Sequence, residues 1–128
     1  MKKLTREWID KAEDDYVVAE REYSNERPIY DAVCFHSQQC IEKYMKAILQ
    51  ENNIEFYKVH DLTFLLSKCK KFLPLLEVYK EELTKLSSFA VEIRYPGIRA
   101  TKEEAENCIS VMRKIRKIIK THFEEKKK

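Results

Sequence analysis

Apolar residues recur at three- and four-residue spacing along most of this chain, which is the pattern of amphipathic helices. The first helix is predicted over residues 5–23, and its apolar face carries Trp8, Ala12, Tyr16, Ala19 and Tyr23. A second helix is predicted over residues 28–51, with Pro28 in its first turn and Asn52 and Asn53 at its end. Its apolar face is broad, carrying Val33, Cys40, Ile41, Tyr44, Met45, Ile48 and Leu49. Such breadth predicts contact with more than one neighbour.

Three further helices are predicted over residues 62–72, over residues 75–93 and from Thr101 onward. Asp61 can cap the first of these three, and Thr101 with Glu104 forms a capping box for the last. The apolar positions of the middle one include Val78, Leu83, Leu86, Phe89, Ala90 and Ile93. The pattern as a whole predicts an all-α, up-and-down bundle of four or five helices. We expect one helical domain over residues 1–128.

Composition supports a helical chain and narrows the chemistry. One glycine and three prolines leave little material for the hairpin turns of a sheet-rich fold. The net charge of +3 is too small to indicate nucleic-acid binding by itself. Signal-like and membrane-spanning apolar runs are missing from the sequence, so we expect a cytoplasmic protein without a membrane partner.

The cysteines and histidines favour structural roles over metal binding. The four cysteines fall inside helical patterns without a Cys-x-x-Cys pair, so we expect buried reduced thiols. The sequence has no zinc-type spacing, and its single glycine excludes a glycine-rich phosphate loop. We therefore expect neither a metal site nor a cofactor.

One side of the second helix carries a set of polar side chains at helical spacing. His36, Gln39, Lys43 and Lys46 follow one another at +3, +4 and +3, with Glu42 at the edge. An imidazole, an amide and two ammonium groups on one surface can hold a phosphate and the edge of a base. The alternative is an ordinary solvated helix face.

Two arginines flank the turn that follows the fourth predicted helix. Arg94 and Arg99 enclose Tyr95, Pro96 and Gly97, and a guanidinium can bind phosphate through two parallel hydrogen bonds. Alternatively, Arg94 pairs with a carboxylate or caps helical carbonyls. The last helix is also basic, which suits either RNA phosphates or its own dipole.

The order of several motifs is more specific than any of them alone. Trp8, Ala12, Asp14 and Asp15 come first, and residues 34–49 follow with the sequence CFHSQQCIEKYMKAIL. Residues 59–62 read VHDL and residues 94–96 read RYP. This order resembles the HEPN domain family, and the QQxxEKxxKA segment is its most specific part.

The resemblance implies a small helical bundle that pairs as a homodimer. It also implies three functional classes: a nucleotide-binding module, the partner subunit of a minimal nucleotidyltransferase in a toxin–antitoxin-like pair, and a metal-independent ribonuclease toxin. The ribonuclease branch carries an arginine followed after four to six residues by a histidine. Neither Arg94 nor Arg99 has such a histidine, and only Arg116 and His122 match, near the C-terminal end of the last helix.

These observations lean against catalysis, since the ribonuclease motif is missing from its expected place. We predict a non-catalytic HEPN domain that dimerises and binds a nucleotide, an RNA or a nucleotidyltransferase partner. The residues predicted to bind are His36, Gln39, Glu42, Lys43, Lys46, Arg94, Tyr95 and Arg99. The alternatives are a ribonuclease toxin that uses Arg116 and His122 or a composite site across the dimer, and a dimeric scaffold without a ligand.

Overall fold

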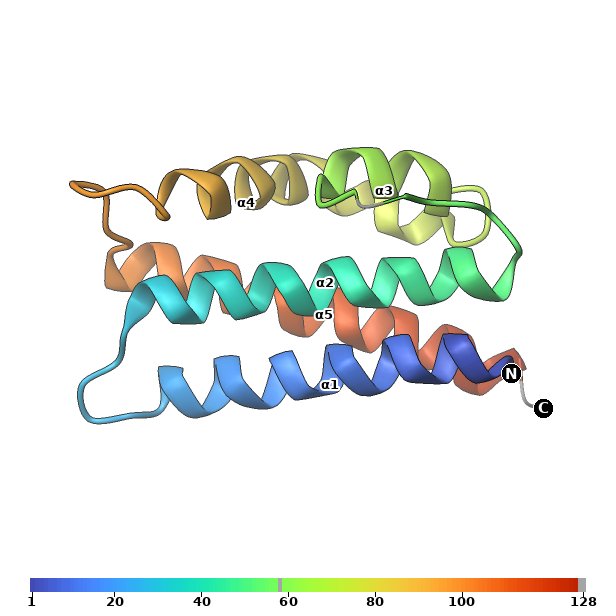
Figure 1. The fold of residues 1–128 in the computed structure, drawn as a ribbon, viewed down its shortest axis with the longest axis horizontal. Coiled ribbons are helices and arrows are strands. Elements are labelled where there is room, and N and C mark those ends of the chain that lie inside the picture. The colour runs from blue at the N-terminus through green and yellow to red at the C-terminus, as the bar shows by residue number, and fades with distance from the viewer. Residues whose placement is uncertain (58, 127–128) are drawn as a thin grey trace.

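The computed structural model describes residues 1–57 and 59–126, and this part of the chain contains helices and no strand. The elements in order are α1 (Lys3–Tyr23), α2 (Tyr30–Glu51), α3 (Leu62–Cys69), the 3-10 segment η1 (Pro74–Tyr79), α4 (Lys80–Glu92) and α5 (Lys102–Lys126). Helices α1, α2 and α5 run lengthwise, while α3 and α4 form a further layer beside α2 (Figure 1). The predicted all-helical bundle is confirmed.

Helix α2 forms the centre of the bundle. It packs against α1, α3, α4 and α5, and thirteen of its 22 residues are buried. Its broad apolar face is therefore used within the chain, and the predicted contact with more than one neighbour is confirmed. Because α2 is surrounded, only a narrow side of it stays accessible to solvent.

Several helix ends lie where local chemistry predicts them. The Asp61 carboxylate accepts a hydrogen bond from the backbone N–H of Thr63 at 2.9 Å and so caps α3. At the start of α5, the Glu104 N–H donates to the Thr101 hydroxyl at 3.1 Å, and the Thr101 N–H donates to Glu104 at 2.8 Å. After α2, Asn53 takes the left-handed conformation with φ of 57°.

Three predicted boundaries are wrong. The helix predicted over residues 75–93 begins with the 3-10 segment η1, whose tighter winding moves Val78 off the apolar face. Val78 is 69% exposed as a result. Pro28 precedes α2, because Ile29 at the helix N-cap is extended. Helix α3 ends at Cys69 rather than at residue 72.

The four cysteines are free and buried, as expected. Within the described ranges, no helix combines the length and the apolar character needed to cross a membrane.

Candidate functional site

The polar residues predicted on the second helix do share one side of α2, but their exposure differs. We call His36, Gln39, Lys43 and Lys46 the α2 stripe. His36, Gln39 and Lys43 are partly exposed, whereas Lys46 is 5% exposed. The stripe is therefore open to solvent over its N-terminal part and covered at Lys46.

A single carboxylate from α1 organises the open part of the stripe. Asp15 accepts a hydrogen bond from Lys43 Nζ at 2.6 Å and lies 2.9 Å from His36 Nδ1. His36 and Lys43 are seven residues apart, about two turns of helix, so both reach the same carboxylate. Asp15 is 8% exposed, and a buried carboxylate needs such partners. The pairing holds the imidazole and the ammonium in fixed positions at the surface.

The covered part of the stripe is a buried ion pair with two further partners. Lys46 Nζ donates to Glu42 Oε2 at 3.0 Å, and His60 Nδ1 lies 3.1 Å from the same oxygen. Gln38 Nε2 donates to Glu42 and to the His60 carbonyl at 3.3 and 3.0 Å. Glu42 and Lys46 thus neutralise each other, and together with Gln38 they fix the segment before α3 to α2.

Aromatic rings cover the Lys46 ammonium on its other side. Its nitrogen lies 5.3 Å from the Trp8 ring centre and 5.8 Å from that of Phe56. The two rings meet edge to face with their centres 5.7 Å apart. They also border a cavity of about 540 Å³, which we call the Trp8 cavity. Its lining consists of Trp8, Gln50, Asn53, Ile54, Glu55, Phe56 and Tyr57.

The turn after α4 places Arg94 beside the N-terminal half of α2. The guanidinium carbon lies 5.6 Å from the centre of the Phe35 ring, and the neighbouring His36 ring meets Phe35 edge to face. The Ala100 N–H donates to the Asp31 carboxylate at 2.7 Å, which fastens the end of the turn to the start of α2. The structure thus brings Arg94 close to the open part of the stripe.

The arginines of this turn and the lysines of the α2 stripe differ in whether a carboxylate lies beside the charged group. Within residues 1–57 and 59–126, no carboxylate lies within 4.0 Å of the guanidinium of Arg94 or Arg99. Both arginines are exposed, as is Tyr95. The predicted alternative, an Arg94–carboxylate pair, is therefore not formed in the part of the chain that the structure describes. Arg94 keeps its hydrogen-bond donors available for an anion.

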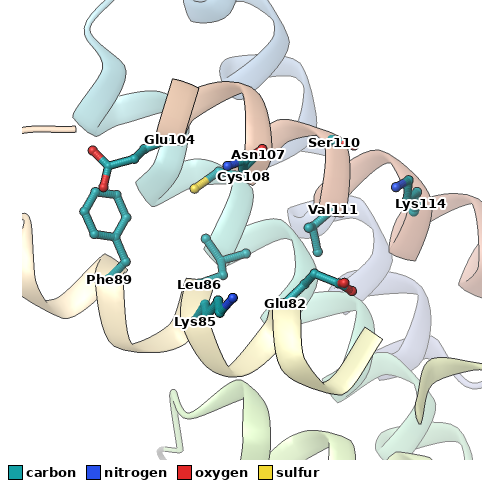
Figure 2. Close-up of a pocket in the computed structure, with 10 residues that line it drawn as sticks. All are labelled: Glu82, Lys85, Leu86, Phe89, Glu104, Asn107, Cys108, Ser110, Val111 and Lys114. Atoms are coloured by element: carbon teal, nitrogen blue, oxygen red, sulfur yellow. The ribbon is translucent and has the colours of Figure 1, made fainter. Parts of the chain in front are cut away.

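A second cavity, of about 490 Å³, lies between α4 and α5 (Figure 2). Leu86, Phe89 and Val111 give it an apolar surface, and none of the predicted binding residues lines it. Its charged lining residues are of both signs: Glu82, Lys85, Glu104 and Lys114. The balance of charge makes this cavity a poor place for a phosphate.

The predicted basic strip of α5 is partly paired with α1. Arg116 donates two hydrogen bonds to the Glu13 carboxylate, at 2.7 and 2.8 Å, and Arg113 binds Glu20 in the same bidentate way. His122 is half-buried, and burial lowers its pKa. The Arg116 guanidinium is thus engaged inside the bundle.

A family model for the HEPN domain matches residues 5–122. The chain belongs to the HEPN family. This HEPN chain is similar to a protein of Methanocaldococcus jannaschii named "Putative toxin MJ1304", with 27% identity over 141 aligned residues that cover 97% of this chain and 91% of that protein. It is also similar to the crystal structure of ST0689, an archaeal HEPN homologue, with 29% identity and a TM-score of 0.70. That match covers 94% of this chain and 98% of the other.

The most HEPN-specific segment of the sequence supplies much of the internal network. Gln38, Glu42 and Lys46 are all buried and bonded to one another or to His60. Glu42 and Lys46 were predicted as site residues from the sequence, whereas Asp15, the partner of His36 and Lys43, was not. The only signal for Asp15 was its place among the first residues of the HEPN-like motif order.

Proposed function

We propose that this HEPN domain binds the phosphate of a nucleotide or an RNA beside the open part of the α2 stripe, without cleaving RNA itself. Arg94 carries the proposal, because its exposed guanidinium has no carboxylate partner in the described chain and lies against Phe35 of α2. His36 and Lys43, fixed by Asp15, complete the anion site. Lys46 is paired with the buried Glu42, so we assign it a positioning role rather than a contact with the ligand.

We further propose that the domain works in a toxin–antitoxin-like pair. The name of the Methanocaldococcus jannaschii relative supports this setting. A minimal nucleotidyltransferase is the partner protein that the sequence resemblance suggests. Binding of a phosphate-rich ligand by the HEPN domain is compatible with such a pair, since both subunits would then act on nucleotides or RNA.

The test is binding to ATP, GTP and an RNA octamer, measured by calorimetry at low salt. We expect Arg94→Ala to weaken binding at least about tenfold, since hydrogen bonds to charged groups contribute roughly 1.5–3 kcal/mol. Lys117→Ala is the matched control, because it removes the same charge from an exposed position on α5. The affinity of the wild type should fall as salt rises.

Two results would contradict the proposal: no binding of any of these ligands, or equal weakening by Arg94→Ala and Lys117→Ala. Sedimentation of the Arg94→Ala variant distinguishes a binding role from a role in assembly. A variant that loses affinity while sedimenting like the wild type supports the phosphate site.

A further inference from the structure

We propose that the Trp8 cavity receives a base of a single-stranded RNA whose backbone runs along α2 to Arg94. The inference rests on the proposed function and identifies the ligand of that site as a strand rather than a mononucleotide. It follows from the chemistry of the cavity lining and from the distance between the cavity and Arg94.

The cavity offers the groups that single-stranded RNA readers use. Trp8, Phe56 and Tyr57 bring three aromatic rings to it, and bases of any identity can stack on such rings. Tyr57 is 82% exposed, so its ring is available to a ligand. The amide of Gln50 both donates and accepts hydrogen bonds, and the Glu55 carboxylate accepts them. A base with an exocyclic amino group, such as adenine, matches this combination.

The charges around the cavity favour a base inside it and phosphates outside. Among residues 1–57 and 59–126, those that line it include Glu55 and no cation. The Lys46 ammonium, which contacts the Trp8 and Phe56 rings, is neutralised by Glu42. The ammonium of Lys2 contacts two lining residues: it donates to the Gln50 carbonyl at 3.4 Å and also contacts the side chain of Asn53. Lys2 is exposed. A ligand that enters base first therefore leaves its phosphate near Lys2.

The distance along α2 decides between a nucleotide and a strand. Gln50, which lines the cavity, follows Phe35, which contacts Arg94, by fifteen residues, which is about 22 Å of helix. Stacked nucleotides advance about 3.4 Å each, so roughly six of them cover this length. A single nucleotide cannot occupy both ends. The partly exposed Lys43, Gln39 and His36 lie between the two ends and can contact the backbone.

The experiment uses Trp8, the only tryptophan of the chain, as a reporter inside the cavity. The probes are an adenylate octamer and AMP, followed by tryptophan fluorescence and by anisotropy of a labelled octamer. We expect the octamer to quench Trp8 and to bind at least tenfold more tightly than AMP. Tyr57→Ala should weaken octamer binding about tenfold, whereas Tyr57→Phe keeps the stacking ring and the affinity.

Phe64→Ala is the matched control, because Phe64 is an exposed aromatic residue on α3 that lines neither cavity. The proposal is overturned if Tyr57→Ala binds the octamer like the wild type, or if AMP binds as tightly as the octamer. If Arg94→Ala weakens binding while Tyr57→Ala does not, the cavity assignment fails and the phosphate site stands. If neither probe binds, both proposals fail.

Discussion

Glu13 is the acceptor of a three-way contact between α1, α2 and α5. The Arg116 guanidinium donates two hydrogen bonds to it, and the buried Tyr44 hydroxyl donates a third at 2.5 Å. The guanidinium carbon also lies 3.8 Å from the centre of the Tyr16 ring. Hydrogen bonding from Arg116 lowers the pKa of Glu13 to about 2, against the opposing effect of burial. The contact therefore favours the ionised carboxylate.

The lowered pKa of Glu13 predicts that the stabilising effect of Arg116 depends on pH. Because the folded pKa lies below the ordinary value of 4.5, Glu13 adds stability above about pH 4.5 and loses it as the pH falls toward 2. We expect Arg116→Ala to reduce the free energy of unfolding by about 2 kcal/mol at pH 7. The deficit should shrink at pH 3, measured by urea denaturation.

Arg113→Ala provides the comparison for this measurement. Arg113 makes the same bidentate contact with Glu20, but its side chain is 50% exposed against 24% for Arg116. An exposed pair contributes at most about 1 kcal/mol, so its loss should cost less. An Arg116→Ala deficit that is as large at pH 3 as at pH 7 would show that packing on Tyr16, rather than the charge of Glu13, supplies the stability.

At the scale of helices, the sequence was informative wherever local chemistry decides the structure. The long periodic patterns of α1, α2 and α5 are formed over nearly their predicted lengths. The caps at Asp61 and Thr101 depend on side chains two or three residues from the atoms they satisfy. The prediction of an α-helix was wrong over residues 74–79, because these residues form a 3-10 helix. A 3-10 helix has fewer residues per turn than an α-helix, so α-helical spacing does not describe its faces.

The candidate site was predictable only in part for a related reason. Helical spacing places His36, Gln39 and Lys43 on one side of α2, since it depends on one element alone. The partners come from other elements: Asp15, which pairs with His36 and Lys43, lies on α1, and His60, which contacts Glu42, precedes α3. No spacing rule connects residues so far apart in the chain. Among the described residues the stripe lysines are paired and Arg94 has no carboxylate partner, and this contrast emerged only from the packed structure.

At the scale of the molecule, the predicted homodimer needs a surface other than the apolar face of α2, which is buried within the chain. Five of the exposed large apolar side chains fall between residues 75 and 98: Leu75, Val78, Val91, Tyr95 and Ile98. Three of them, Val91, Tyr95 and Ile98, lie in the last turn of α4 and in the turn that carries Arg94, and apolar side chains that gather at a surface commonly mark an interface. We expect this region, next to Arg94, to contribute to self-association.

Sedimentation at micromolar concentration tests the dimer. We expect a species of twice the chain mass of 15.4 kDa, and we expect Val91→Asp to shift it toward the monomer, because a charge in an apolar interface loses its hydration. Val18→Asp is the control, at a similarly exposed apolar position on α1. A wild type that sediments only at 15.4 kDa would refute the homodimer.

The geometry of α5 bears on whether the whole protein cuts RNA. Acid–base cleavage needs a histidine and a cation that both reach the scissile phosphate. Arg116 and His122 are six residues apart, so their directions differ by about 120° around the helix and their heights by about 9 Å. The Arg116 guanidinium also donates two hydrogen bonds to Glu13 and is therefore already paired. A phosphate at His122 would therefore lack this cation.

We accordingly expect purified protein to leave RNA intact, with gel analysis of a labelled single strand as the measurement. His122→Ala and His36→Ala are the variants that make the outcome decisive. Cutting that His122→Ala abolishes would establish the ribonuclease alternative at α5. Cutting that survives His122→Ala but disappears in His36→Ala would instead assign acid–base chemistry to the imidazole that Asp15 holds in place. Activity unchanged in both variants would point to His60, the remaining histidine, or to a contaminating nuclease, because neither substituted histidine would then take part.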